Sequence, residues 1–577
     1  MRKTFLLALL LLIPALVCAK TGHLVLLTVV QQTGQPLTGG TADLYLEVRS
    51  GNGRIFIDSF PLTKLDTQIS TRFANQIACS YLEIDCSVYD FFYKIEASSP
   101  IVGGPSAGAA ITVLTVSVLT NLPLYNDTVI TGTIDAGGLI GPVSGIYEKA
   151  LAAQQAGFSK VLVPKWTPSL WISSGNTTNQ SSNETKDPLA NLSIEVIKIG
   201  TLDEAVYAYT GHYFNNKSTT VEIMPDYARV MQLVAEELCN RTQALTALIE
   251  NRKLNYTDEE NYTRRAEQTF NSSKYYATAS LCFSNNIRLR SRLLESYTQE
   301  QLTKKFSALI KAASQLTDEI DNRSFETLTD LETYMIVKER LLETLDALEQ
   351  LNLTNLSTSQ LSYAIERYNS AKVWSQFFDL PGKKILLDKA HLKESCQKKI
   401  SEAEERLSYV DLYAPGFLSK SRQQLGQAYV QLGVQSYAFC LFTASKVKAE
   451  ADMFITASGV AQSQARALAE EQLLAARKII AKEQAKGIFP ILGYSYLEYA
   501  ESLLEYNPIN AITFAQYALE MSNLDMYFPQ PRETTYFLAP EYYVLFIGGL
   551  ITGVLVTFLI QNIKPKKTPK SLPGKKR

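Results

Sequence analysis

A chain of 577 residues is long enough to form two or more domains. Its formal net charge is −1 at pH 7, from 56 Lys and Arg against 57 Asp and Glu. A chain with this balance has no overall positive field, so its composition argues against nucleic acid as a partner.

The first residues have the pattern of a secretory signal peptide. Arg2 and Lys3 precede an apolar run over residues 5–17, and the small residue Ala19 follows. A charged start, a short apolar run and a small-residue exit are typical of a segment that is removed on export. We therefore predict a signal peptide over residues 1–19. An uncleaved N-terminal anchor is the alternative, although the apolar run is short for a membrane span.

Residues 22–213 mix strand-like and helix-like segments. Runs rich in β-branched and aromatic residues predict strands, and apolar runs with a helix-ending Gly or Asn predict helices. The expected strands are 23–30, 55–57, 91–95, 130–134, 161–163 and 194–197, and the expected helices are 106–119, 148–156 and 202–209. This mixture predicts one compact α/β or α+β domain. Residues 173–187, rich in Ser, Thr and Asn, are expected to form an exposed loop.

Residues 221–535 have a different pattern, which predicts an all-helical array. Tyr227, Met231, Val234 and Leu238 recur at the spacing of one helical face. Similar spacing continues along this region, with breaks at proline and glycine. No fixed-period repeat is visible, so a helix-repeat arrangement remains one option. The many tyrosines of this region either pack between helices or contact peptides.

The C-terminal end predicts a membrane anchor. Residues 542–563 contain no charged residue and are long enough to cross a bilayer as a helix. Residues 564–577 carry lysines and an arginine but no acid. Because positive charge stays on the cytoplasmic side, we predict a single-pass protein of the cell membrane with an extracellular bulk and a basic cytoplasmic tail. A buried core helix followed by a nucleic-acid-binding tail is the less favoured alternative.

The cysteines and the glycosylation sequons also indicate an extracytoplasmic chain. Apart from Cys18 in the signal peptide, the cysteines fall in three pairs along the chain: Cys79 and Cys86, Cys239 and Cys282, Cys396 and Cys440. This distribution predicts disulfides in an oxidising compartment, with their connectivity open. No C-x-x-C spacing indicates a zinc site, and we expect no metal or other cofactor. Sequons are dense between residues 126 and 355, which predicts a glycosylated surface.

Two glycine-marked motifs contain a serine and a lysine that fit one chemistry. Ser106 lies in Gly103-Gly104-Pro105-Ser106-Ala107-Gly108, and Lys149 ends a motif that starts at Gly141. A serine hydroxyl needs a base to take its proton, and none of the three histidines lies in a nucleophile motif. A lysine can serve if burial lowers its pKa to about 7–8. We predict Ser106 as nucleophile and Lys149 as general base, although a tight turn and a solvated helix lysine would explain each motif alone.

Taken together with Thr131-Gly132 and Gly138 between them, these motifs resemble the catalytic domain of the Lon proteases, peptidase family S16, over about residues 22–210. The resemblance implies an α+β Lon-type proteolytic domain in which Thr131 orients the ammonium of Lys149. Homo-oligomeric rings are a further option that it raises. No G-x-x-x-x-G-K-[ST] phosphate loop is present, unlike in typical Lon enzymes. The chain is similar to the archaeal secreted or membrane-anchored Lon-like proteases, which implies ATP-independent cleavage of flexible or unfolded polypeptides.

The sequence departs from the Lon pattern at two positions, and two other functions are alternatives. Gly103 stands where Lon enzymes usually have an acid, and Thr133 stands where the family often has Glu. A catalytically silent surface protein that binds partners through its helices is the main alternative. A GHMP-type small-molecule kinase is a weaker one, because that class lacks the block from Thr131 to Lys149 and needs ATP.

Overall fold

A computed structural model describes residues 19–30, 37–167, 188–214, 220–258, 261–352, 356–457, 460–528 and 540–561. Most of the predicted signal peptide, the expected loop at 173–187 and the basic tail at 564–577 lie outside the described residues. The chain divides into two compact units, Met1–Pro529 and Gln530–Arg577. The boundaries predicted for the individual domains remain predictions.

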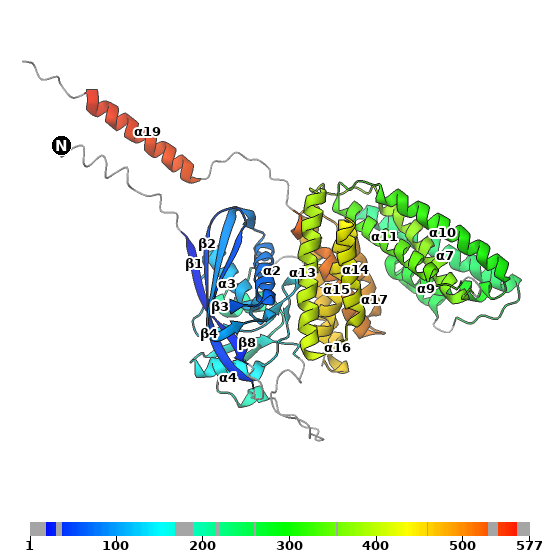
Figure 1. Cartoon of the computed structure of the whole chain (residues 1–577), viewed down its shortest axis with the longest axis horizontal. Helices are drawn as coiled ribbons and strands as arrows, with labels where there is room; N and C mark the ends of the chain where they lie inside the picture. The colour runs from blue at the N-terminus through cyan, green and yellow to red at the C-terminus, as the bar shows by residue number, and fades with distance from the viewer. Residues whose placement is uncertain are drawn as a thin grey trace, which may run out of the picture. The chain divides into compact units, whose positions relative to one another are not determined.

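The N-terminal part of the first unit is built on a mixed seven-stranded sheet (Figure 1). Its strands are β1 (Lys20–Val30), β2 (Thr38–Ser50), β3 (Ile55–Thr63), β4 (Tyr89–Val102), β5 (Thr128–Ile130), β8 (Lys160–Pro164) and β9 (Glu195–Ile199). They lie in the order β3-β4-β2-β1-β5-β8-β9. The β1–β2 and β2–β4 pairs are antiparallel, and the other pairs in this sheet are parallel.

Helices cover both faces of this sheet. They are α2 (Leu65–Leu82), α3 (Gly108–Thr120), α4 (Ile146–Gln155) and α6 (Leu202–Thr210). Helix α3 is buried from Gly108 to Leu119 and packs on β1, β2 and α2. On β1, Leu26 belongs to the core with α3, whereas Leu27 belongs to the core with α4. Because neighbouring strand residues point to opposite faces, α3 and α4 lie on opposite sides of the sheet.

The predicted α/β character is confirmed, with three local errors, one of which is that the long strand β2 was not predicted. The strand expected at 130–134 is interrupted: β5 ends at Ile130, and β6 (Thr133–Ile134) pairs with β7 (Ile140–Gly141) in a separate small sheet. The interruption arises because the Gly132 amide turns to the carbonyl of Ser106 instead of continuing the sheet. Helix α2 was not predicted, although the buried Phe73 and Ile77 stand four residues apart.

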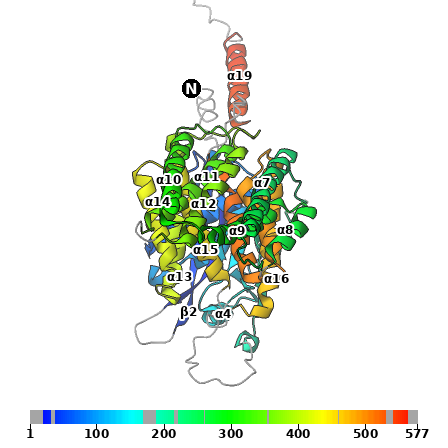
Figure 2. The ribbon, with the colours of Figure 1, turned by 90° about the vertical axis from the view of Figure 1, so that its right-hand side faces the viewer.

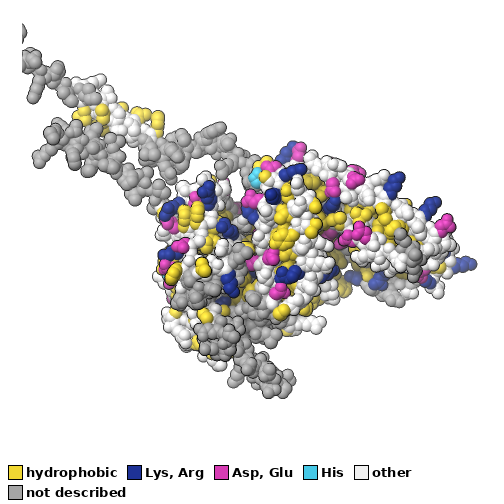
Figure 3. Space-filling view, viewed as in Figure 1, with side chains coloured by type: hydrophobic (Ala, Val, Ile, Leu, Met, Phe, Trp, Pro, Cys, Tyr) yellow, Lys and Arg dark blue, Asp and Glu magenta, His cyan; other side chains and the backbone are white. Residues whose placement is uncertain are grey.

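The rest of the first unit is helical, as predicted (Figure 2). Its α-helices are α7 (Pro225–Asn251), α8 (Tyr262–Asn271), α9 (Tyr275–Leu294), α10 (Gln299–Asp321), α11 (Leu328–Glu349), α12 (Thr358–Trp374), α13 (Lys389–Tyr413), α14 (Ser419–Gly433), α15 (Tyr437–Ala457), α16 (Ala465–Ala485), α17 (Ile491–Leu503) and α18 (Pro508–Ser522). Charged side chains of both signs and hydrophobic side chains lie at its surface (Figure 3). Its hydrophobic core also takes in Ala136 and Leu139 of the N-terminal domain, whose own residues form two further cores.

Three disulfides join the cysteines that are neighbours in sequence. Cys79 pairs with Cys86, Cys239 with Cys282, and Cys396 with Cys440. The first bond fixes the end of α2, the second joins α7 to α9, and the third joins α13 to α15. The predicted disulfides are therefore confirmed, and the connectivity that the sequence left open is the sequential one.

The second unit contains α19 (Pro540–Gln561), which overlaps the predicted membrane segment. Among the residues that the structure describes, no helix has both the length and the apolar content needed to cross a membrane. The transmembrane assignment of residues 542–563 is therefore not supported, although a helix forms there.

Candidate active site

The turn that carries Ser106 lies between the end of β4 and the start of α3. Gly104 begins this turn with φ of 103°, a conformation that only glycine adopts without strain. Pro105 to Ala107 form one turn of 3₁₀-helix, and α3 follows at Gly108. Ser106 is half-buried and so remains accessible. It stands at a helix N-terminus, where backbone N–H groups and the helix dipole favour negative charge.

Two backbone hydrogen bonds hold the segment at Gly132 against this turn. The Gly132 amide donates to the Ser106 carbonyl at 3.0 Å, and the Ala109 amide donates to the Gly132 carbonyl at 3.0 Å. On the other side, the Thr131 amide donates to Leu162 of β8 at 3.1 Å. Thr131 and Gly132 therefore bridge the serine turn and the central sheet.

Lys149 lies on α4 with its ammonium inside the domain. Its side chain is only 2% exposed, and Nζ donates a hydrogen bond to Thr131 Oγ1 at 3.0 Å. Burial lowers the pKa of Lys149 to about 7, and the neighbouring Glu148 opposes this change. A lysine in this state is neutral in a large fraction of molecules at neutral pH, which a general base requires.

A close approach of two backbones sets the position of α4. Helix α4 packs on β1 and β2. A Cβ atom at Gly39 of β2 would lie 2.0 Å from the carbonyl oxygen of Glu148. Only glycine permits this approach, and the residue held there directly precedes Lys149.

The structure thus brings the three predicted site residues into one hydrogen-bonded group. Ser106 is bonded through its carbonyl to Gly132, and Lys149 is bonded to the adjacent Thr131. Within the described residues, no hydrogen bond joins the side chains of Ser106 and Lys149. The roles predicted for these residues remain a hypothesis that this geometry supports.

Gly103 faces the side chain of Lys64, just before α2. A Cβ atom at Gly103 would lie 2.6 Å from Lys64 Cδ. The position that usually holds an acid in Lon enzymes is therefore packed against a lysine stem in this chain. Thr133, the other departure, is fully buried on β6.

Sequence reasoning missed a buried arginine from the helical region that contacts the segment behind the site. Arg406 of α13 is 4% exposed and donates to the Ile134 carbonyl and to Asp135 Oδ1, each at 2.7 Å. It also pairs with Asp452 of α15. Burial raises the pKa of Asp135 to about 7, against the opposing effect of Arg406. The short strand after Thr131 is therefore fixed by a helix more than 270 residues away in sequence.

Further ionic contacts complete this junction. Lys448 pairs with Asp452 and Glu520, and its ammonium lies 4.9 Å from the ring centroid of Phe73 on α2. Lys399 also pairs with Glu520. These charged side chains are almost fully buried, which is tolerated because each has an opposite partner.

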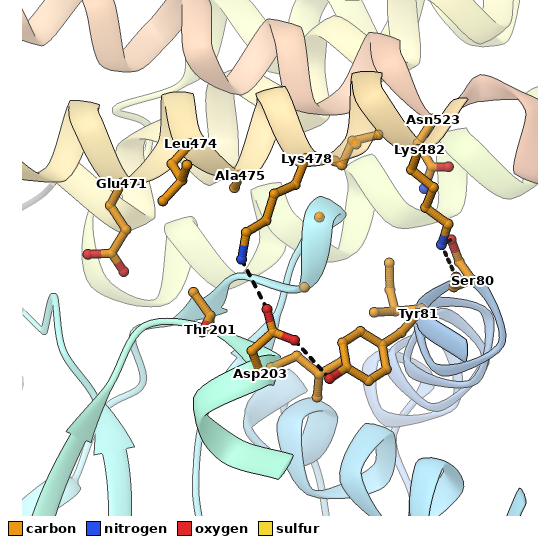
Figure 4. A pocket seen from close by; sticks show the side chains of 15 residues that line it. Ser80, Tyr81, Thr201, Asp203, Glu471, Leu474, Ala475, Lys478, Lys482 and Asn523 are labelled. Carbon is orange, nitrogen blue, oxygen red and sulfur yellow. Dashed lines mark hydrogen bonds and ion pairs between the residues drawn. The ribbon is translucent and has the colours of Figure 1, made fainter. Parts of the chain in front are cut away.

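A small cavity of about 100 Å³ lies in the same junction, beside α16 (Figure 4). Lys478 of α16 pairs with Asp203, which also accepts a hydrogen bond from the Tyr81 hydroxyl. Lys482 of α16 donates to the backbone and hydroxyl oxygens of Ser80. The charged groups drawn around this cavity are thus already engaged by protein partners. Among the described residues, no cluster of three or more His, Cys, Asp or Glu side chains could hold a metal ion.

Comparison with known proteins agrees with this geometry. The Lon protease (S16) C-terminal proteolytic domain matches residues 93–169, which include all three predicted site residues. A Lon protease of Syntrophus aciditrophicus is 42% identical over 77 residues, 13% of this chain and 10% of that protein. A Lon protease of Methylocella silvestris is 44% identical over 75 residues, 13% of this chain and 9% of that protein. A Lon protease of Fervidobacterium nodosum is 34% identical over 131 residues, 22% of this chain and 16% of that protein.

These matches make part of the chain similar to the proteolytic domain of serine peptidases of the Lon type. The similarity to the Lon (S16) proteolytic domain covers residues 93–169. The chain spans only about a tenth to a sixth of the length of the curated relatives that it matches. The helical region lies outside the matched residues.

Proposed function

We propose that the chain is an ATP-independent endopeptidase that cleaves flexible or unfolded polypeptides with a Ser106–Lys149 dyad. The observation that carries this proposal is the buried ammonium of Lys149, hydrogen-bonded to Thr131 and held beside the turn of Ser106. A lysine buried at 2% exposure with a lone hydroxyl partner is costly for stability, and such groups concentrate at functional sites. The Lon-type match over the same residues supports the assignment.

The proposed reaction uses the two side chains in turn. Neutral Lys149 accepts the proton of Ser106 Oγ while this oxygen attacks the scissile carbonyl carbon. The resulting oxyanion accepts hydrogen bonds from backbone N–H groups of the turn that carries Ser106. Lys149 then gives its proton to the leaving amine, which leaves an acyl-enzyme on Ser106. Water then attacks the ester, and Lys149 takes a proton from this water and returns it to Ser106 Oγ as the acyl group leaves as a carboxylic acid.

Thr131 has a positioning role in this mechanism. Its hydroxyl accepts from Lys149 Nζ, so it fixes where the lone pair of the neutral amine points. The Gly132 amide holds the carbonyl of Ser106, so the same segment sets the position of the nucleophile. Substitution of Thr131 by valine should therefore lower kcat more than it raises KM.

We place this activity outside the cytosol. Three disulfides support an oxidising compartment. The predicted signal peptide agrees with export, and exposed sequon asparagines such as Asn126, Asn191 and Asn240 are available for glycosylation. Extracytoplasmic compartments lack ATP, which fits a sequence without a phosphate-binding loop. Membrane anchoring is not part of this proposal.

The test is hydrolysis of an unfolded protein such as reduced, alkylated casein without nucleotide. Wild type should release peptides, whereas Ser106→Ala and Lys149→Ala should not. Equal activity of the three proteins would reject the dyad. If wild type is folded but inactive on every unfolded substrate, the chain is instead a binding protein that uses its helical region.

A further inference from the structure

The helical region contains a partly open cavity of about 370 Å³ where α7, α9, α11, α12, α15, α17 and α18 meet. Several of these helices are labelled in Figure 2. Its volume lies within the range of about 300–1,000 Å³ that is typical of small-molecule sites. Seven of its lining side chains are aromatic, and three others are Arg or Lys. Four of the region's tyrosines, Tyr276, Tyr496, Tyr499 and Tyr517, line this cavity.

Arg340 of α11 is a buried cation in this cavity without an ion-pair partner among the described residues. It is 5% exposed, and its guanidinium lies 4.6 Å from the ring centroid of Trp374. Its Nε donates to Ser370 Oγ at 2.9 Å and its Nη1 to the Ile336 carbonyl at 3.2 Å. Its Nη2 has no hydrogen-bond partner in the described part of the chain. Burial and the neighbouring Arg367 lower the pKa of Arg340, whereas Glu339, which forms ion pairs with other cations, opposes this change.

The other charged groups of the cavity neutralise one another. Glu339 pairs with Lys446 of α15 and with Arg367 of α12. Arg367 also pairs with Glu343. Among the described residues, Arg340 is therefore the cation lining the cavity that forms no ion pair. Because buried charges are normally paired, this site is complementary to one negative charge.

Two tyrosine hydroxyls in the cavity are also unpartnered. Tyr276 and Tyr496 are only 9% and 5% exposed, and both line the cavity. Neither hydroxyl has a hydrogen-bond partner among the described residues. Both residues line the cavity, so their hydroxyls are free to donate hydrogen bonds to acceptor oxygens of a bound ligand.

We propose that this cavity binds a carboxylate whose body is aromatic or apolar. The carboxylate would take hydrogen bonds from Arg340 and from the hydroxyls of Tyr276 and Tyr496, since such charge-assisted bonds are the strongest that a guanidinium makes. The aromatic walls would contact the body of the ligand. The same chemistry is offered by the C-terminal residue of a polypeptide and by a free carboxylic acid. The site uses none of Ser106, Thr131 and Lys149, so it does not rest on the proposed protease activity.

The test measures binding to the full chain carrying Ser106→Ala, so that peptides are not consumed. The probes are N-acetyl-L-phenylalanine and its amide, followed by calorimetry and by tryptophan fluorescence. The acid should bind at least about tenfold more tightly than the amide, because a bond to a charged group is lost. Arg340→Gln should abolish this preference, and Tyr496→Phe should weaken the acid several-fold. Tyr494→Phe, on the same helix but outside the cavity lining, is the matched control and should bind like the parent.

Two peptides that end in phenylalanine distinguish a polypeptide C-terminus from a free carboxylic acid as the natural ligand. One peptide has a free C-terminus and the other an amidated one. Tighter binding of the free-carboxylate peptide than of the free acid identifies a polypeptide end; binding of the free acid alone identifies a small carboxylic acid. Equal affinity for acid and amide, or no binding of either, would overturn the proposal. Tyr276→Phe and Tyr496→Phe keep the test valid if Arg340→Gln fails to fold, since each removes only a hydroxyl. Unchanged acid binding in both would also overturn it.

Discussion

Replacing Lys149 by methionine should stabilise the folded protein, and the gain should shrink as pH rises. In the unfolded chain this lysine has its ordinary pKa of 10.5, whereas burial lowers it to about 7 in the folded state. The unfolded state therefore binds more protons between these values, so wild-type stability rises with pH from about 7 to 10.5. Each unit of difference between the two pKa values corresponds to about 1.4 kcal/mol. At pH 7 burial of Lys149 therefore lowers the free energy of unfolding of wild type by roughly 4 kcal/mol.

Methionine keeps the length of the side chain and removes this cost. It also removes the hydrogen bond to Thr131, which contributes about 1 kcal/mol. We expect the free energy of unfolding of Lys149→Met to exceed that of wild type by roughly 3 kcal/mol at pH 7 and by only about 1 kcal/mol at pH 9.

Urea unfolding of the two proteins at pH 7 and pH 9 measures this difference in the free energy of unfolding. Hydrogen exchange of the α4 amides gives a second, local measurement. Lys94→Met removes an exposed ammonium paired with Glu96 and is the control, for which no comparable gain is expected. A Lys149→Met protein no more stable than wild type at pH 7, or a gain that does not change with pH, would show that Lys149 is not desolvated in the folded state. The base proposed for the reaction would then lack its physical basis.

Three further predictions concern the site and its supports. Because neutral Lys149 is the base, kcat/KM on an unfolded substrate should be low at pH 6, rise through about pH 7 and level off above it; a rate independent of pH from 6 to 8 would contradict this. Gly39→Ala should cost about 1–3 kcal/mol by thermal unfolding and lower kcat, because its methyl group meets the backbone that precedes the lysine, whereas Gly40→Ala meets only a side-chain oxygen and should cost less. Arg406→Met should cost about 3–5 kcal/mol and lower activity, because it leaves the buried carboxylate of Asp135 without its cation. Arg466→Met, which removes an exposed ion pair, should change neither quantity.

Local sequence patterns predicted most of the N-terminal domain. The β-branched runs at 23–30 and 161–163 are strands, and the apolar run after Ser106 is a buried helix. The strand predicted over residues 130–134 is wrong after Ile130, where β5 ends. These residues have strand propensity, but the Gly132 amide donates to the carbonyl of Ser106 instead of pairing with a neighbouring strand. Propensity cannot distinguish these two uses of the same residues.

The site was predictable where residues close in sequence carry the chemistry. Ser106 and Lys149 lie in short motifs, and Thr131 came from the family resemblance. Arg406 was not predictable, because nothing in its own sequence surroundings marks a contact with Asp135. The unpaired charge of Arg340 was likewise hidden, since only the packed helices decide which acids reach which cations. Long-range pairing of this kind follows from tertiary packing and leaves no local periodicity.

The central claim is that Ser106 is a nucleophile activated by a neutral Lys149. A fluorophosphonate probe on the purified protein, with the modified residue located by mass spectrometry, tests it most directly. We predict covalent labelling of Ser106 in wild type, at a rate that rises through about pH 7, with no labelling in Ser106→Ala and little in Lys149→Met. Labelling of Ser106→Ala at the wild-type rate, or modification of another residue in wild type, would contradict the account.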